Sequence, residues 1–139
     1  FEDIGTTYRF FIESGRIACG YKSQYFYMIR KNSIVSGDFN PHKLDMLEMT
    51  DQMADKVIRR YPNLRNAVVR RQVYARFSTL NQMLDVNGYH EERKAIIRFI
   101  KQYKKAILND KRSPKRDKIA VRLLSMGYPI YKMAWKILK

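Results

Sequence analysis

The stretch FEDIGTTYRFFIESGRIACGYKSQYFYMIRKNSIVSG, residues 1–37, decides the fold that we predict for the start of the chain. Glu2 and Asp3 precede a short apolar run, and free backbone amides favour carboxylates at the N-terminus of a helix. Gly15 is expected to end this helix. The aromatic and β-branched residues of 17–29 then predict one or two short strands, or a hairpin.

A basic turn is expected directly after this strand. Arg30, Lys31, Asn32 and Ser33 place two cations and two small hydrogen-bonding side chains in succession. Guanidinium, ammonium and hydroxyl groups are common ligands of phosphate. The sequence therefore predicts a turn that can bind a phosphate.

In order and spacing, these motifs closely resemble the distal part of bacterial family 2 glycosyltransferases, which are inverting enzymes with an A-type fold. The resemblance rests on an acidic segment at the start of a helix, a tyrosine-rich strand end and the basic turn. The matching segments are FEDIGTT (1–7), YFY (25–27) and RKNSI (30–34). The fold and the function that this family implies are expectations for this chain.

The resemblance implies roles for four residues. Asp3 would be the general base that removes the proton of the acceptor hydroxyl as this oxygen attacks the anomeric carbon, and Glu2 would orient or support it. Arg30 and Ser33 would lie near the donor diphosphate. The implied reaction transfers a sugar from a nucleotide-sugar donor to a glycan or lipid-linked acceptor in cell-surface polysaccharide biosynthesis.

The family also implies a part that this sequence lacks. Its members begin with a nucleotide-binding α/β half that contains an Asp-x-Asp metal site, and neither that motif nor a Gly-rich βαβ unit occurs here. Because the sequence starts at Phe1 without a methionine, we expect a C-terminal portion of a larger enzyme that is inactive alone. A divalent metal, Mg²⁺ or Mn²⁺, would bind in the other half, and no metal ligand is expected in this chain.

Composition points to an anionic partner. The 139 residues carry 28 Lys and Arg against 13 Asp and Glu, a formal net charge of +15. Such a charge suits phosphate-rich partners, namely nucleic acid, an anionic membrane face, or a polyanionic carbohydrate and its lipid-phosphate carrier.

A single cysteine, Cys19, argues against a disulfide framework and agrees with the reducing cytoplasm. No apolar run is long enough to span a bilayer, so membrane contact is expected to be peripheral, at the inner face.

The rest of the chain is predicted to be helical. We assign 1–37 to the distal end of a catalytic domain and 38–139 to a C-terminal helical domain. The predicted fold is mainly α, an irregular bundle of four or five helices preceded by the N-terminal helix and the short β element. Helix starts are expected after Asn40-Pro41, around Asn63, after Tyr89, after Ser113-Pro114 and at Tyr128-Pro129, and helix ends at Tyr61-Pro62, Asn87-Gly88, within 109–118 and at Gly127.

The last helix combines cations with an aromatic side chain. Lys132, Trp135, Lys136 and Lys139 could contact an anionic membrane or another polyanion, with the indole near the lipid headgroups. The same helix could instead pack on the bundle. Both interpretations stay open at this point.

Two other classes of function compete with the transferase. A basic helical module could bind nucleic acid through its arginine faces, with aromatic side chains stacking on bases. Its strongest support is the segment 90–93, HEER, in which a histidine and an arginine have a spacing that also occurs in tyrosine recombinases. No tyrosine follows Trp135, however, to serve as the nucleophile of such an enzyme. A scaffold module, with Glu2 and Asp3 as a simple helix cap, is the third class. The additional matches through Ile34 favour the glycosyltransferase, with nucleic-acid binding as the alternative.

Overall fold

The chain is mainly α-helical, as predicted. A computed structural model describes residues 2–26, 28 and 39–137, and the side chain of Glu2 is outside this description. Short 3-10 turns, η1 (Pro41–Leu44) and η2 (Pro62–Leu64), each begin with a proline and lead into α2 and α3. The α-helices are α1 (Glu2–Glu13), α2 (Asp45–Arg60), α3 (Arg65–Gln82), α4 (His90–Gln102), α5 (Lys104–Asn109), α6 (Lys115–Met126) and α7 (Tyr128–Ile137).

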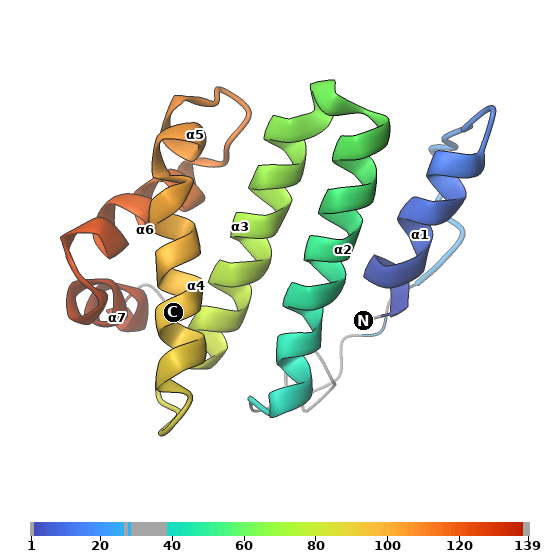
Figure 1. Ribbon diagram of the computed structural model, residues 1–139. Coiled ribbons are helices and arrows are strands. Elements are labelled where there is room, and N and C mark those ends of the chain that lie inside the picture. Colours follow the sequence, from blue (N-terminus) through green and yellow to red (C-terminus); the bar gives the residue numbers. More distant parts are fainter. Residues whose placement is uncertain (1, 27, 29–38, 138–139) are drawn as a thin grey trace.

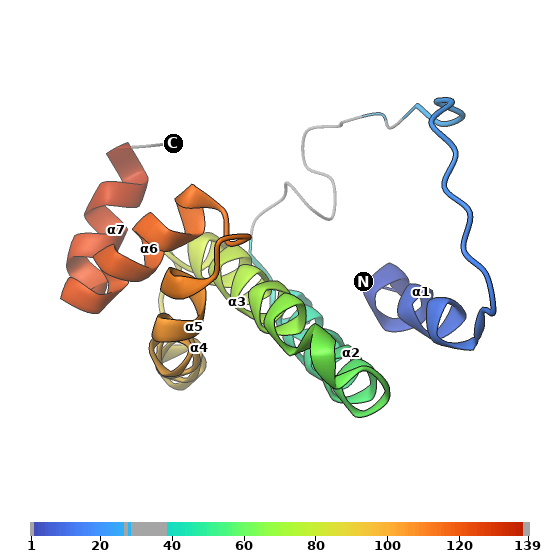
Figure 2. The same ribbon diagram turned by 90° about the horizontal axis from the view of Figure 1, so that it is seen from above.

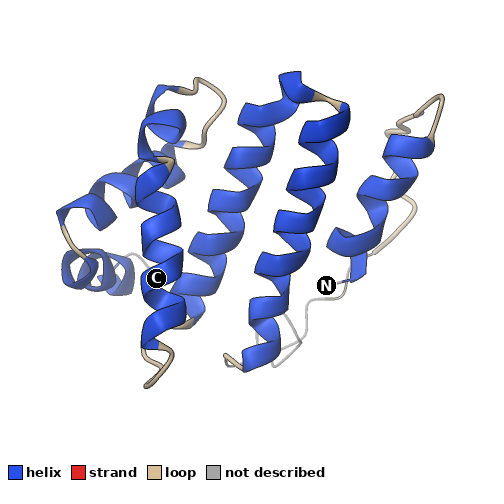
Figure 3. Cartoon of the chain, viewed as in Figure 1, coloured by secondary structure: helices blue, strands red, loops and turns tan. Residues whose placement is uncertain are grey.

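The predicted β element is not found. Residues 17–26 and 28 contain no strand, while positions 27 and 29 lie outside the described residues, and Figure 3 shows only helices and loops in the described part. A strand needs the backbone of a neighbouring strand to pair its amides and carbonyls. No described segment offers such an edge, and Tyr21, Tyr25 and Phe26 are exposed instead of packed on a core. Within residues 17–26, high β propensity therefore did not suffice to form a strand.

The long helices stand next to one another in a row. Figure 1 shows α2 and α3 as an antiparallel pair joined through η2, with α1 beside α2 and α4 beside α3. Seen from above, α6 and α7 lie at the opposite end of this row from α1 (Figure 2). The contacts run in the same order, from α1 to α2, α3 and α4, and then to α6 and α7.

Helix ends follow the local residue chemistry in most places. α6 begins at Lys115, directly after the predicted Ser113-Pro114 start, and ends at Met126 before Gly127. Gly127 has a φ of 143°, which side-chain-bearing residues rarely adopt, and this allows α7 to start at once in a new direction. α3 ends at Gln82, before the predicted end at Asn87-Gly88. Residues 83–85 form a turn, so the helix stops before the chain reaches the glycine.

The core lies between α3, α4, α6 and α7. Its members come from the apolar stripes of these helices, which alternate with charged faces at helical spacing. Residues of α3 are central, since α3 contacts α2, α4 and α5. The buried cluster contains Val69, Val73, Phe77, Leu80, Met83, Leu84, Ile96, Ile100, Ile107, Ala120, Val121, Leu124 and Tyr131.

A buried arginine joins three helices. Arg76 on α3 is only 7% exposed, and its Nη2 and Nη1 atoms donate hydrogen bonds to Oδ2 and Oδ1 of Asp51 on α2, at 2.7 and 3.0 Å. Gln72 adds a bond to Oδ1 of the same carboxylate, at 2.8 Å. On the other side, the guanidinium carbon lies 3.4 Å from the ring centroid of Phe99 on α4. One cation thus links α2, α3 and α4.

This link gives a stability prediction. Asp51→Ala should lower the free energy of unfolding by about 1–3 kcal/mol, because it leaves the Arg76 charge buried without its carboxylate. Urea unfolding followed by circular dichroism measures the change. The control is Asp55→Ala, one turn further along α2, where the carboxylate is exposed and the expected change is within about 0.5 kcal/mol. Equal effects of the two substitutions would contradict the role given to Arg76.

Candidate functional site

The acidic pair lies in the first turn of α1, where the sequence placed it. Glu2 and Asp3 are the first two residues of this helix, and Asp3 is exposed. Among the described residues, none forms a hydrogen bond or ion pair with the Asp3 carboxylate. Asp3 is therefore open to an external hydroxyl group.

Docking of α1 on α2 fixes the position of this carboxylate. Tyr8 is the buried anchor of α1, with 7% of its surface exposed. One turn before it, Gly5 faces Met49 of α2, and a Cβ atom at Gly5 would lie 3.5 Å from the Met49 sulfur. This is an ordinary van der Waals distance, and it places Gly5 against the first half of α2. Asp3 is thus presented from a packed helix and not from a loop.

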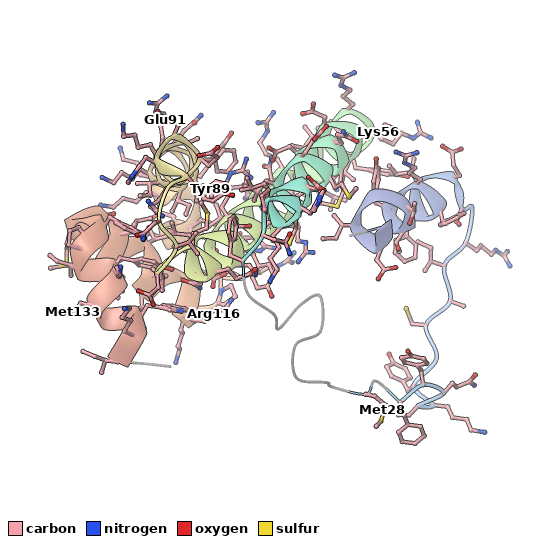
Figure 4. The ribbon with its side chains drawn as sticks, turned by 90° about the horizontal axis from the view of Figure 1, so that it is seen from below. Met28, Lys56, Tyr89, Glu91, Arg116 and Met133 are labelled. Atoms are coloured by element: carbon pink, nitrogen blue, oxygen red, sulfur yellow. The ribbon has the colours of Figure 1, made fainter. Side chains whose placement is uncertain are left out.

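Two hollows flank the contact between α1 and α2. One, of about 570 Å³, is lined by four cations, and the other, of about 330 Å³, is almost wholly apolar. The cations are Arg9 on α1 and Lys56, Arg59 and Arg60 on α2, and one carboxylate, that of Glu13, lines the same hollow with Tyr8 and Ile12. Figure 4 shows Lys56 at the end of α2 that lies beside α1. We call this hollow the α1–α2 basic groove.

Sequence reasoning assigned no role to the α1–α2 basic groove. The signal was present, because Lys56, Arg59 and Arg60 have the i, i+3, i+4 spacing that places side chains on one helix face. What the sequence did not reveal is that α1 would lie against this face and add Arg9. An anion that enters the groove would meet cations from both helices.

The predicted diphosphate ligands cannot be placed in this geometry. Arg30 and Ser33 lie outside the described residues, so their positions relative to Asp3 are not described. Lys139, one of the predicted membrane contacts, also lies outside the described residues. These three assignments stay predictions.

Lys132 and Lys136, two of the predicted membrane contacts, share one acidic partner. Their Nζ atoms lie 3.3 and 2.5 Å from Oδ1 of Asp85, in the connection between α3 and α4. The hydrogen bond from Lys136, assisted by that from Lys132, holds the pKa of the Asp85 carboxyl below its ordinary value. Part of the positive charge of α7 is thus compensated within the molecule.

Aromatic stacking attaches α7 to the bundle. Tyr131 is fully buried, and its ring stacks on Phe77 of α3 and on Trp135, with both centroid distances 5.8 Å. Its hydroxyl donates a 2.5 Å hydrogen bond to Oδ1 of Asn81, and burial raises the pKa of this hydroxyl. Trp135 is only partly exposed. Packing of α7 on the bundle, one of the two interpretations left open by the sequence, is what the structure shows.

Neither a metal cluster nor a membrane span is found in the described part. Within residues 2–26, 28 and 39–137, no three His, Cys, Asp or Glu side chains gather in a way that could hold a metal ion. No helix of the same residues is both long and apolar enough to cross a bilayer.

Comparison with known proteins identifies no relative: no family model, curated protein or solved structure matches the chain. Inference about function therefore rests on the residues themselves. The features that carry it are the exposed carboxylate of Asp3 on a docked helix, the α1–α2 basic groove and the excess of cations.

The ion pairs of Asp85 predict a measurable titration. In the folded chain, the Asp85 pKa measured by carboxyl NMR should lie below the ordinary 3.8. A lowered pKa means that the two bridges stabilise the fold above that pH and are lost as the pH falls through the folded-state pKa. Lys136→Gln should raise the Asp85 pKa more than Lys132→Gln, because the Lys136 bond is the shorter. An unchanged pKa in both variants would contradict this account.

Proposed function

We propose that this chain is the distal part of an inverting glycosyltransferase that moves a sugar from a nucleotide donor to a glycan or lipid-linked acceptor in cell-surface polysaccharide biosynthesis. The observation that carries the proposal is the position of Asp3. Its carboxylate is exposed in the first turn of a helix that α2 holds in place, which suits a general base. The motif match over residues 1–34 supports the same assignment.

In the proposed reaction, Asp3 accepts the proton of an acceptor hydroxyl while this oxygen attacks the anomeric carbon of the donor sugar. The bond between that carbon and the diphosphate oxygen breaks on the opposite face, so the anomeric configuration inverts. The nucleoside diphosphate leaves with the bonding electron pair. Arg30, with Ser33, would stabilise the negative charge that develops on the diphosphate, and Glu2 would orient Asp3.

The docking of α1 supports this role physically. A general base is effective only when it is held within hydrogen-bond distance of its proton, and packed helices hold side chains more accurately than loops do. Tyr8 and the contact between Gly5 and Met49 supply that support. The nucleotide and its Mg²⁺ or Mn²⁺ would be bound by the α/β half that family 2 enzymes carry.

The cationic surface fits phosphate-bearing partners of such an enzyme. Arg9, Lys56, Arg59 and Arg60 line the α1–α2 basic groove beside the helix that carries Asp3. A lipid-linked acceptor would place its phosphates at the inner face of the cell membrane, where an anionic surface attracts a protein with a net charge of +15. We therefore propose a cytoplasmic enzyme with peripheral membrane contact, to which Lys132, Lys136 and Lys139 contribute.

The first test concerns the proposed base. In the enzyme that includes the nucleotide-binding half, Asp3→Asn should lower kcat by several orders of magnitude and leave donor binding unchanged, because the amide cannot accept the proton. Release of nucleoside diphosphate measures turnover, and calorimetry measures donor affinity. Asp55→Asn, an exposed carboxylate on α2, is the control and should keep full activity. Near-normal turnover of Asp3→Asn would remove Asp3 from this role.

The second test concerns the membrane. The chain should sediment with vesicles that contain phosphatidylglycerol but not with phosphatidylcholine alone, and added salt should weaken the binding because exposed charges are screened. A DNA duplex of equal phosphate concentration serves as the competing polyanion. Tight, salt-sensitive binding to DNA without binding to the vesicles would favour a nucleic-acid-binding module instead.

A further inference from the structure

A third hollow lies at the end of the bundle that is remote from Asp3. It has a volume of about 360 Å³ and is bordered by α3, α6 and α7. We call it the α3–α7 cavity. Arg116, at its rim, lies on the side of the molecule that carries α6 and α7, away from α1 (Figure 4). Its volume is within the range of about 300–1,000 Å³ that small-molecule pockets have.

Aromatic side chains form much of the wall of this cavity. Of these rings Phe77 is buried, Trp135 is partly exposed and Tyr74 is 40% exposed. The rings are held in place by their neighbours. Trp135 stacks on Tyr131, and the guanidinium of Arg116 lies 5.5 Å from the Tyr74 ring centroid. A ligand that enters would therefore meet preformed flat apolar surfaces.

Polar groups around these rings retain unused hydrogen-bonding capacity. The Oε1 atom of Gln82 is buried without a partner among the described residues. Asn81 uses its Oδ1 atom to accept the Tyr131 hydrogen bond, so its amide nitrogen keeps both donors, and no described residue accepts from it. Asp117 is 5% exposed, and the bonds that it accepts from Arg116, at 3.0 and 2.9 Å, both end on Oδ1. The Gln82 oxygen is itself enclosed, so the groups open to a ligand are the Asn81 donors and the Asp117 carboxylate.

We propose that the α3–α7 cavity binds one pyranose unit of a carbohydrate. A sugar ring has apolar C–H faces that can lie on Tyr74 or Trp135, and hydroxyl groups around its edge that both donate and accept hydrogen bonds. The carboxylate of Asp117 and the donors of Asn81 and Arg116 match that edge. A purely apolar ligand would leave the Asn81 amide donors unpaired.

The cavity is separate from the proposed catalytic residue. It is formed by α3, α6 and α7, while Asp3 lies on α1, which contacts α2 at the other end of the row (Figure 1). Sugar binding here depends only on the contacts above. That the bound sugar is a unit of the acceptor glycan, held away from its reacting end, rests on the proposed function. A transferase with such a cavity would retain a growing chain between transfer steps.

Trp135 provides a direct readout, because it is the only tryptophan in the chain and lines the cavity. The experiment titrates the 139-residue chain with the methyl pyranosides of glucose, galactose, N-acetylglucosamine and rhamnose, and with uridine, while tryptophan fluorescence is recorded. We expect a saturable change with at least one pyranoside and none with uridine. Tyr74→Ala should weaken that binding about tenfold.

Tyr61→Ala is the matched control. Tyr61 is 37% exposed and lies under Arg60, much as Tyr74 lies under Arg71, but it is remote from the cavity. Circular dichroism confirms that each variant is folded. Absence of a saturable signal with every pyranoside, preference for uridine, or equal weakening by Tyr61→Ala would overturn the proposal. Asp3→Asn should not change sugar binding, so a failure of the proposed transferase function is distinguishable from a failure of this site.

Discussion

The arrangement of the helices depends on how one buried cation is accommodated. Arg76 lies between α2 and α4, and a buried guanidinium is tolerated only when its charge is paired and its donors are used. Asp51 supplies the pairing from α2, and the face of Phe99 supplies a second favourable contact from α4. Because Arg76 must contact both partners, the positions of α2, α3 and α4 along one another are restricted. The apolar contacts of the core add to this restraint, because interdigitated side chains also oppose sliding.

Much of the helical pattern could be predicted from residue chemistry. Ile96, Ile100 and Ile107 recur at helical spacing, and all three are buried. Ser113-Pro114 and Gly127 mark the boundaries of α6, because proline suits a helix start and glycine permits the backbone turn that follows. The position of Asp3 in the first turn of α1 was predicted for the same kind of local reason. Periodicity and turn chemistry act over a few residues, so they are visible in a sequence.

Features that depend on which helices meet were not predictable. The residues around Tyr131 in the sequence do not indicate that it belongs to the core. It is nevertheless fully buried, because α7 packs on Phe77 and Asn81, about fifty positions earlier in the chain. The α3–α7 cavity and the α1–α2 basic groove exist only through such pairings. The expected strand is not seen in residues 17–26, and the reason is complementary: strand propensity is not enough to form a strand where no partner strand is present.

The distribution of charge connects the fold to its proposed partners. Several carboxylates are used within the bundle: Asp51 pairs with Arg76, Asp85 with two lysines of α7, and Asp110 with Arg70. These pairs join elements far apart in the sequence, so acidic residues serve as links between helices. Few acids are then left to compensate the cations on the surface, and a net charge of +15 makes the compact chain repel itself. Phosphates of a lipid carrier or an anionic membrane would relieve that repulsion, whereas a neutral sugar in the α3–α7 cavity would not. The phosphates would therefore bind the cationic surface through long-range electrostatic attraction, and the sugar would bind the α3–α7 cavity through short-range contacts.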